Sequence, residues 1–326
     1  MSNKNKRVMI LDALNLFLRA YIVNPTISKE GAPIGGTVGF IKSLQKLCRE
    51  IKPDKVVICW DGRSGSRKRK QINKNYKEGR SPIRLNRAVR TLSETEEKEN
   101  KIWQMYRLVE YLNLFPVIQL VTDEVEADDI IAYICKQSQY KDYQKVIVSS
   151  DKDFYQLLDD NTVLHRPVQD AWQNANRIIE EFGIHPNNFA LARAMAGDTS
   201  DNLSGIGGVG LKTVKKRFPF FAEEKSVMIP DLVTFCENQN QKVKAFTAVI
   251  EGVDIIKENY KIMQLYSPLL SVQAKTKFKW AIDNFELQFN KTEFDLLLLE
   301  DGLGENSWFD LVTFFRKMCL DNKAIK

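Results

Sequence analysis

The sequence has few of the residues on which base-catalysed hydrolysis and zinc binding depend. It contains two histidines, His165 and His185, and both lie outside the clusters of charged residues described below. Because histidine is the side chain that most readily exchanges a proton near neutral pH, histidine-based catalysis is not expected. The five cysteines are odd in number, widely spaced and never form a Cys-x-x-Cys pair. This pattern argues against a disulfide framework and against a zinc site.

Long apolar runs are also absent. No apolar run approaches eighteen residues, and residues 1–7 are polar and basic with no signal-peptide pattern after them. We therefore expect a soluble, cytoplasmic protein. With 326 residues and 44% apolar content, the chain is long enough for one large domain or two of ordinary size.

Positive charge is concentrated in one segment. The net charge is +6, but residues 63–90 hold eleven Lys and Arg against a single acid, Glu78. Residues 63–93 lack a sustained apolar period, so we expect a partly mobile arch or clamp that guides a single strand. A basic stripe beside an acidic pocket indicates a polyanionic ligand, although a solvated charged face is the alternative interpretation.

Three apolar runs of the sequence end in acids. Val8–Leu11 precedes Asp12, residues 56–60 precede Asp61, and Val146–Val148 precedes both Asp151 and Asp153. These runs read as buried strands of a parallel sheet, and ligands gather at the carboxyl ends of such strands. No histidine or lysine nearby could pair with all of these acids. The group of acids therefore predicts bound divalent cations.

Helical periodicity separates the predicted strands and continues after them. The pattern predicts an α/β fold, with amphipathic helices over residues 14–21, 35–51, 94–114, 177–182 and 187–195, and further helices near 231–238, 242–256, 289–299 and 308–320. No chemistry is visible in residues 220–326.

Two further groups of acids lie near helix ends. Glu126, Asp128 and Asp129 fall in the first turn of a predicted helix, and Asp198 and Asp201 follow residues 187–195. Acids are favourable at helix N-termini, so capping is the structural alternative. Three acids in four residues exceed what capping needs.

A glycine-rich turn precedes a basic helix. Gly205, Gly207, Gly208 and Gly210 alternate with apolar residues, and the cations Lys212, Lys215 and Lys216 follow. This is the helix-hairpin-helix pattern, in which glycines let backbone N–H groups approach a phosphate. The alternative is a plain tight turn between two helices.

Taken in order, five segments resemble the motifs of the 5′-nuclease, or flap endonuclease, family. They are Ile10–Ala20, Tyr76–Arg80, Glu126–Asp129, Ser149–Asp153 and Gly197–Asn202. The length and the helical C-terminal region most resemble the phage 5′–3′ exonucleases and the phage RNase H branch. Ala13 and Trp60 replace residues that are usually glycine and phenylalanine in the family, and these departures concern backbone and packing.

The resemblance implies a PIN-like fold with a mostly parallel central sheet flanked by helices. Residues 1–195 would form the nuclease domain, and residues 196–326 the helix-hairpin-helix module and a helical C-terminal region. The implied cofactors are two Mg²⁺ or Mn²⁺ ions, with a K⁺ ion at the hairpin. Nine acids match the family's metal-binding cluster: Asp12, Asp61, Glu126 and Asp128 around the first ion, Asp151, Asp153, Asp198 and Asp201 around the second, and Asp129 near both.

The resemblance also implies roles for basic and aromatic residues in contacts with DNA. Lys77 and Arg80 match the pair that contacts the scissile phosphate, and Tyr76 matches the aromatic residue on which a base stacks. We also expect DNA contacts from the hairpin residues above and from Arg19, Arg67, Lys68, Arg69 and Lys70.

The implied reaction is metal-dependent hydrolysis near the 5′ end of flap, nicked or RNA-primed duplexes during replication. The implied partners are these duplexes and replication proteins such as a single-stranded-DNA-binding protein. We expect a monomer with no membrane partner, located in the host cytoplasm if the chain is phage-encoded. Two alternatives remain at this point, a PIN-type ribonuclease that needs about four of the acids and a non-catalytic flap-DNA-binding protein.

Overall fold

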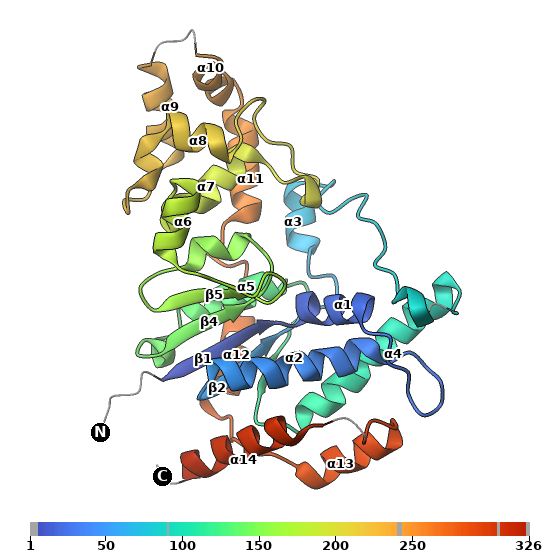
Figure 1. Cartoon of the computed structure of the whole chain (residues 1–326). Helices are drawn as coiled ribbons and strands as arrows, with labels where there is room; N and C mark the ends of the chain where they lie inside the picture. The colour runs from blue at the N-terminus through green and yellow to red at the C-terminus, as the bar shows by residue number, and fades with distance from the viewer. Residues whose placement is uncertain (1–5, 90, 240–242, 305–306, 324–326) are drawn as a thin grey trace. The chain divides into compact units, whose positions relative to one another are not determined.

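The computed structural model describes residues 6–89, 91–239, 243–304 and 307–323. The chain divides into two compact units, and each is assembled from parts distant in sequence (Figure 1). Unit one contains residues 1–60, 82–120 and 271–326, and unit two contains residues 61–81 and 121–270. No helix in the described ranges is both long enough and apolar enough to cross a membrane.

Three parallel strands form the centre of unit one. They follow the spatial order β3-β2-β1, with Met9 opposite Val56 and Val57 opposite Ile118. Their bounds are β1 (Arg7–Asp12), β2 (Lys55–Cys59) and β3 (Ile118–Leu120). The helices of this unit are α1 (Ala13–Val23), α2 (Gly35–Ile51), η1 (Arg87–Val89), α4 (Glu94–Asn113), α12 (Val272–Asp283), α13 (Lys291–Glu300) and α14 (Phe309–Lys323).

A buried amide joins two helices of unit one. Gln104 of α4 accepts hydrogen bonds from the N–H groups of Gly36 (2.7 Å) and Thr37 (3.3 Å), and it donates to the Pro33 carbonyl (2.8 Å). A Cβ atom on Gly36 would lie 2.8 Å from the Gln104 amide oxygen. Glycine is therefore required where α2 begins, and α4 satisfies backbone groups that would otherwise be left unpaired at this helix end.

Three strands also lie in unit two. Strands β4 (Gln144–Val148) and β5 (Thr162–Arg166) are parallel, and β6 (Ala171–Gln173) runs antiparallel to β5. The helices are α3 (Arg67–Ile72), α5 (Ala127–Cys135), η2 (Ser138–Tyr140), η3 (Asp153–Leu157), α6 (Ala175–Phe182), α7 (Pro186–Ala196), η4 (Thr199–Asp201), α8 (Leu211–Arg217), η5 (Pro219–Ala222), α9 (Ile229–Glu237), α10 (Lys244–Glu251) and α11 (Val253–Met263).

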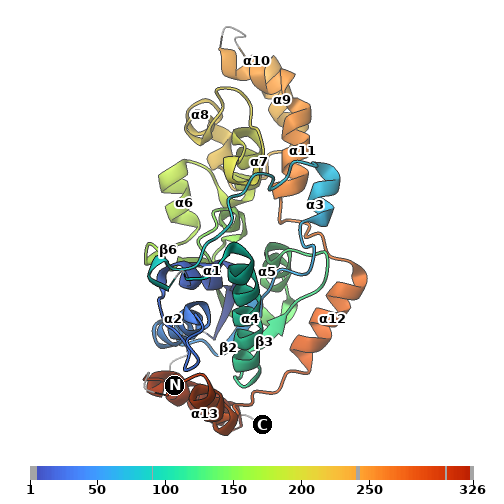
Figure 2. The ribbon, with the colours of Figure 1, turned by 90° about the vertical axis from the view of Figure 1, so that its right-hand side faces the viewer.

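Helix α11 contacts several other helices of unit two. It packs along α7 and also contacts α3 (Figure 2). Its buried Asn259 donates to the carbonyls of Ala194 (3.0 Å) and Ser204 (2.8 Å). These bonds fix the end of α7 and the start of the glycine hairpin to one helix, which positions the segment that carries Asp198 and Asp201.

The fold class predicted from the sequence is confirmed, since the chain is mixed α/β with mostly parallel strands. One helix prediction is wrong. A single helix was expected over residues 242–256, but α10 and α11 are separate, and residue 242 lies outside the described residues. The break falls at Gly252, where a Cβ atom would lie 2.2 Å from the Ile206 side chain. Helix α12, helix α3 and strand β6 were not anticipated.

The aromatic core of unit one gives a stability test. The Phe294 side chain of α13 is fully buried, and its ring centroid lies 5.1 Å from that of Phe115. We expect Phe294→Ala to lower the free energy of unfolding by about 3–5 kcal/mol, because it removes buried apolar area and leaves a cavity. The control Leu296→Ala changes a half-exposed residue of the same helix and should cost less than about 0.5 kcal/mol. Urea unfolding measures both, and equal losses would contradict this account.

Candidate acidic site

Unit two contains eight of the nine predicted metal-binding acids. They are Asp61, Glu126, Asp128, Asp129, Asp151, Asp153, Asp198 and Asp201. The ninth, Asp12, ends β1 in unit one, where its carboxylate accepts a hydrogen bond from the Asn15 N–H (3.1 Å) and caps α1. The eight acids come from four separated stretches of sequence, so tertiary folding is what brings them into one unit.

Asp151 and Asp153 lie just past the carboxyl end of β4. A short turn holds them, because the Asp151 carboxylate accepts from the Asp153 N–H (2.8 Å) and the Asp151 N–H donates to Ser149 Oγ (3.1 Å). Burial raises the pKa of Asp153 to about 7, and the negative charge of Asp151 adds to this effect. Burial also raises the pKa of Asp151, to which the charge of Asp201 contributes. Both carboxyls are therefore poised to gain from a nearby cation.

Arg193 pairs with two of these acids. Its Nε lies 3.1 Å from Asp153 Oδ1, and its Nη2 forms an ion pair with Asp198 Oδ2. Burial opposes ionisation of Asp198, but its hydrogen bonds with Ser200 and the charge of Arg193 outweigh that effect and lower the pKa of Asp198. The sequence analysis missed Arg193. Its place in the last turn of α7, five residues before Asp198, was the available signal.

Arg69 is buried between two acids. Its Nη1 lies 2.7 Å from Asp129 Oδ2 and 3.0 Å from Glu126 Oε2, and its Nε donates to the Ile262 carbonyl of α11 (3.0 Å). The side chain is 4% exposed, so it offers almost no surface to DNA, in contrast to the expectation from the sequence. The other Asp129 oxygen accepts from the Leu269 N–H (2.8 Å), which ties Asp129 into the protein interior.

Tyr76 and Lys77 both contact Glu126. Lys77 Nζ lies 2.6 Å from Glu126 Oε1, and the Tyr76 hydroxyl donates to Glu126 Oε2 at 3.2 Å. Burial opposes ionisation of Glu126, but Arg69 and Lys77 outweigh it and lower the pKa of Glu126. Tyr76 is only 3% exposed. Its ring is therefore packed in the interior, and base stacking on it, expected from the sequence, would require it to move.

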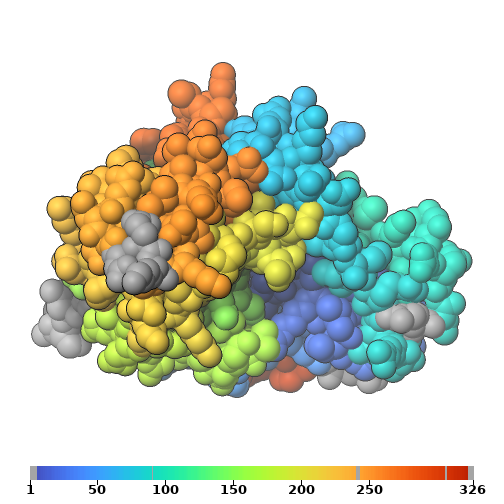
Figure 3. All heavy atoms as spheres, turned by 90° about the horizontal axis from the view of Figure 1, so that it is seen from above, coloured from blue at the N-terminus to red at the C-terminus, as the bar shows by residue number. Residues whose placement is uncertain are grey.

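The basic segment is tied to the loop that carries Asp201. The Lys77 N–H donates to the Asp201 carbonyl (2.9 Å), and Asn202 donates to the Asn75 carbonyl (3.0 Å). Arg80 forms an ion pair with Asp201 and donates to the Ser200 carbonyl (3.0 Å). Residues near 75–80 and 200 lie side by side in Figure 3. Lys77 and Arg80 thus pair with acids of the site, and their contact with the scissile phosphate stays a prediction.

A small cavity joins the two predicted metal groups. Asp128 of the first group and Asp153 and Asp201 of the second line a cavity of about 10 Å³, together with Arg69 and Tyr76. This volume holds about one water molecule. Within the described residues, no three of the eight acids bring carboxylate oxygens within 4.8 Å of one another. Three of the acids thus face one small cavity, and at these separations acids would contact a metal partly through water.

The remaining predicted DNA contacts differ in exposure. Arg67 pairs with Glu124, Lys68 donates to the Leu269 carbonyl (2.6 Å), and Lys70 is exposed. In unit one, Arg19 is half-buried on α1, and burial lowers its pKa. Of the basic run at residues 67–70, Arg67 and Lys70 are the cations most exposed to solvent.

The glycines of the hairpin have two different environments. A Cβ atom on Gly205 would lie 2.2 Å from the Ala196 carbonyl oxygen, so this glycine is needed for packing within the chain. Among the described residues, apart from the chain neighbours, no atom lies within 4 Å of a Cβ built on Gly207, Gly208 or Gly210, and Gly208 has φ +76°. Lys215 donates to the carbonyls of Glu180 and Glu181 at the end of α6, so its charge caps that helix.

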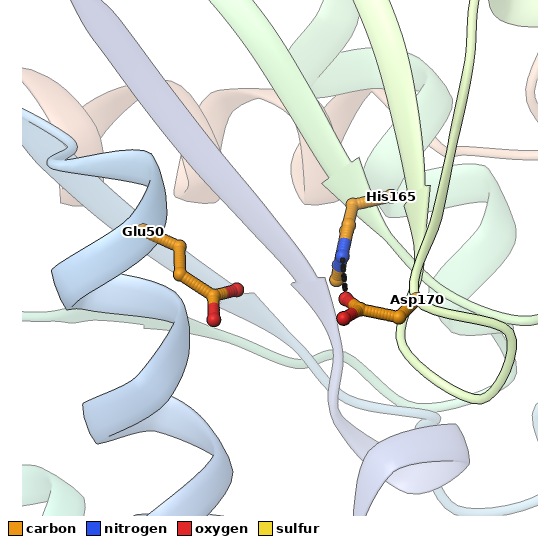
Figure 4. Close-up of side chains that lie close together, drawn as sticks. All are labelled: Glu50, His165 and Asp170. Atoms are coloured by element: carbon orange, nitrogen blue, oxygen red, sulfur yellow. Dashed lines mark hydrogen bonds and ion pairs between the residues drawn. The ribbon is translucent and has the colours of Figure 1, made fainter.

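Neither histidine lies among these acids. His165 Nε2 lies 3.2 Å from Asp170 Oδ1 (Figure 4), and its ring centroid is 4.8 Å from that of Trp172. His185 accepts from the Asn187 N–H (3.2 Å) and caps α7. Figure 4 also labels Glu50, an exposed residue of α2 in unit one. Each histidine has a hydrogen-bond partner in the fold.

The chain is similar to a known exonuclease, a DNA polymerase I and a flap endonuclease. The chain is 27% identical over 270 residues to a 5′-3′ exonuclease of Aquifex aeolicus, covering 81% of this chain and 83% of that protein. It is 26% identical to the thermostable DNA polymerase I of Thermus thermophilus over 92% of this chain, but it spans only 33% of that polymerase's length. Its fold is similar to that of the bacteriophage T5 flap endonuclease solved with DNA and metal ions, with a TM-score of 0.64, 18% identity, and coverage of 92% of this chain and 100% of that one.

Residues 7–183 match the family described as "5'-3' exonuclease, N-terminal resolvase-like domain". This match covers β1 through α6 and includes seven of the nine acids as well as Lys77 and Arg80. The chain therefore belongs to the 5′-3′ exonuclease family defined by this N-terminal resolvase-like domain.

Proposed function

We propose that the protein is a metal-dependent 5′-3′ exonuclease and flap endonuclease that hydrolyses phosphodiesters near the 5′ end of flap, nicked or RNA-primed duplexes during replication. Family membership supports the reaction class. The observation that carries the proposal is that acids from three stretches of unit two, Asp128, Asp153 and Asp201, line one cavity. Lys77 and Arg80 pair with the neighbouring acids Glu126 and Asp201.

The charges of the site fit two divalent ions. Eight carboxylates are matched there by four cations, Arg69, Lys77, Arg80 and Arg193. Four formal negative charges remain, which is the charge that two divalent cations would neutralise. The donors are all carboxylate oxygens, the ligand type that Mg²⁺ and Mn²⁺ prefer. Asp128, Asp153 and Asp201, which line the cavity, would hold these ions together with the other acids of unit two. Asp12 is retained as a ligand on the family resemblance alone.

The cations of the chain would bind and orient the scissile phosphate. Bound divalent ions would supply a water of lowered pKa and neutralise charge on the phosphate. Burial disfavours the charged form of Lys77, but Glu126 and Asp128 outweigh it and raise the pKa of Lys77, so the ammonium keeps its proton and can donate to a phosphate oxygen. The Arg80 side chain is 49% exposed, so it can reach a phosphate without unpacking the interior.

The glycine hairpin would contact the backbone of the duplex. Gly207, Gly208 and Gly210 would bring backbone N–H groups to duplex phosphates, with Lys212 and Lys216 beside them, and the hairpin carbonyls would hold K⁺.

Residues 1–195 would carry the reaction, and residues 196–326 would form the hairpin and the C-terminal region. We also propose that the protein acts as a cytoplasmic monomer with a single-stranded-DNA-binding protein as its replication partner.

The first test is cleavage of a 5′-labelled flap duplex. We expect Mg²⁺ or Mn²⁺ to support cleavage and EDTA to abolish it. Asp151→Asn should lower the single-turnover rate at least about 10²-fold while flap binding persists, because one charge of the metal site is lost. The matched control, Asp142→Asn, makes the same change at an exposed residue before β4 and should retain the wild-type rate. Cleavage that persists in EDTA would contradict the proposal.

The raised pKa of Asp153 predicts a pH dependence of stability. Its pKa moves from 3.8 in a model peptide to about 7 in the fold, so the folded protein binds more protons than the unfolded chain between these values. Without metal, this group should therefore lower stability as pH rises from 4 to 7, by up to about 1.4 kcal/mol per pH unit.

Urea unfolding in EDTA at several pH values measures this effect, and Asp153→Asn should flatten the decline. Adding Mg²⁺ should stabilise the wild-type protein more at pH 8 than at pH 5, because the ion binds the ionised carboxylate. An Asp153→Asn variant with the same pH slope as the wild type would refute the assignment.

The two glycine environments predict opposite outcomes. We expect Gly207→Ala to leave the melting temperature unchanged and weaken duplex binding several-fold, because its Cβ meets no protein atom but would separate the backbone from a phosphate. Gly205→Ala should instead destabilise the fold through its clash with Ala196. Thermal unfolding and fluorescence anisotropy with a labelled duplex separate the two effects. Unchanged affinity in Gly207→Ala would remove the hairpin from the proposed DNA surface.

A further inference from the structure

An arginine of β5 is bound to the turn that carries Asp151 and Asp153. Arg166 is the last residue of that strand, and its Nη2 donates a hydrogen bond to the Ser150 carbonyl (3.2 Å). This carbonyl belongs to the peptide bond that joins Ser150 to Asp151. Arg166 lies outside the five segments that resemble family motifs, so the sequence gave no reason to connect it with the acids.

The hydrogen bond of Arg166 extends the pairing of β4 with β5 into the turn. Val148, the last residue of β4, pairs with His165, and the Ser149 N–H donates to the His165 carbonyl (3.2 Å). The side chain of Arg166, the next residue of β5, then binds the next residue of the turn, Ser150. The backbone that leads into Asp151 is therefore attached to the sheet.

Arg166 also contacts the chain after Asp153. Burial raises the pKa of Tyr155, and the charge of Arg166 together with a side-chain hydrogen bond between the two residues counteracts this rise. The Tyr155 ring is 1% exposed, and its centroid lies 5.2 Å from that of Phe189 in α7, so packing fixes its position. One guanidinium thus contacts the chain both before Asp151 and after Asp153.

These contacts fix the shape of the turn and do not neutralise its acids. In the part of the chain that the structure describes, Arg166 forms no ion pair with a carboxylate, whereas Arg193 pairs with Asp153. The Arg166 Nε is buried and has no hydrogen-bond partner among the described residues. Because an unpaired buried donor destabilises a fold, stability alone gives little reason for an arginine at this position.

We propose that Arg166 is a positioning residue for the second metal ion, because it holds the Asp151–Asp153 turn in the shape that binds the ion. The inference rests on the proposed function. Two carboxylates on one short turn repel each other, so a free turn would favour conformations that separate them. Since Arg166 fixes the turn before the ion arrives, less conformational freedom is lost on binding, and the affinity for the ion is higher.

Mn²⁺ binding by the full-length protein tests this role. Mn²⁺ is titrated into metal-free protein without DNA, and the unbound ion is measured by its electron paramagnetic resonance signal. We expect Arg166→Met to weaken the binding of one ion by about 3- to 10-fold, the effect of losing one hydrogen bond. Arg166→Lys should restore part of the affinity, because an ammonium can donate to the Ser150 carbonyl. Saturating Mg²⁺ should return flap cleavage by both variants to nearly the wild-type rate.

A second variant and a double variant separate positioning from a general effect on the fold. Tyr155→Phe keeps the buried ring, removes only the hydroxyl beside Arg166, and should weaken the same ion by a smaller factor. Asp151→Asn should also weaken this ion. Adding Arg166→Met to Asp151→Asn should then cost less affinity than Arg166→Met does alone, because both changes act on one turn. Fully additive losses would overturn the proposal.

Arg177→Met is the matched control. Arg177 is exposed and also donates to a backbone carbonyl, that of Trp172 in β6, a strand that contains none of the predicted metal-binding acids. We expect this variant to keep the wild-type affinity for Mn²⁺, and an equal loss would overturn the role of Arg166. If the wild-type protein cleaves the flap but Arg166→Met binds Mn²⁺ as tightly, the positioning role is refuted and the nuclease function stands. If the wild-type protein does not cleave, the proposed function itself fails.

Discussion

Unit two depends on the neutralisation of buried carboxylates by cations from distant parts of the chain. Glu126 and Asp129 lie at the start of α5 with side chains almost fully buried, and Arg69 from α3 pairs with both. Burial of an unpaired carboxylate costs several kcal/mol, so α5 cannot keep this position unless α3 is docked. The same guanidinium reaches the Ile262 carbonyl, which links α3 to α11. The buried acids at the start of α5 thus determine where α3 lies.

Much of this architecture could be predicted from local sequence patterns. The strands that precede Asp12 and Asp151 are short apolar runs, and the direction of a parallel strand places the acid that follows it at the ligand-binding edge. The exposed glycines of the hairpin could also be recognised, because their spacing and the following cations are adjacent in sequence. Predictions succeeded where the relevant partners are within a few residues of one another.

The identity of each cation's partner could not be predicted in this way. The eleven cations of residues 63–90 look equivalent in sequence, but Arg69 is buried in ion pairs and Lys70 is exposed. Tyr76 likewise has an aromatic ring that could stack on a base, but the ring is buried like that of a core residue. These differences arise from contacts across 50 or more positions, such as that between Tyr76 and Glu126. The helix break at Gly252 has a similar origin, because the close neighbour, Ile206, lies far away in the sequence.

In the proposed nuclease, the pairing of Arg80 with Asp201 would connect the binding of metal with the binding of the nucleic-acid strand. Arg80 occupies an oxygen of Asp201, and the Lys77 backbone is held by the carbonyl of the same residue. A phosphate that draws the guanidinium away leaves the Asp201 carboxylate with one counter-charge fewer, which favours a metal ion beside it. By thermodynamic reciprocity, an ion that binds Asp201 first releases Arg80 for the phosphate to the same extent. In the proposed nuclease, the change in metal affinity caused by the strand and the change in strand affinity caused by metal would therefore measure a single coupling free energy.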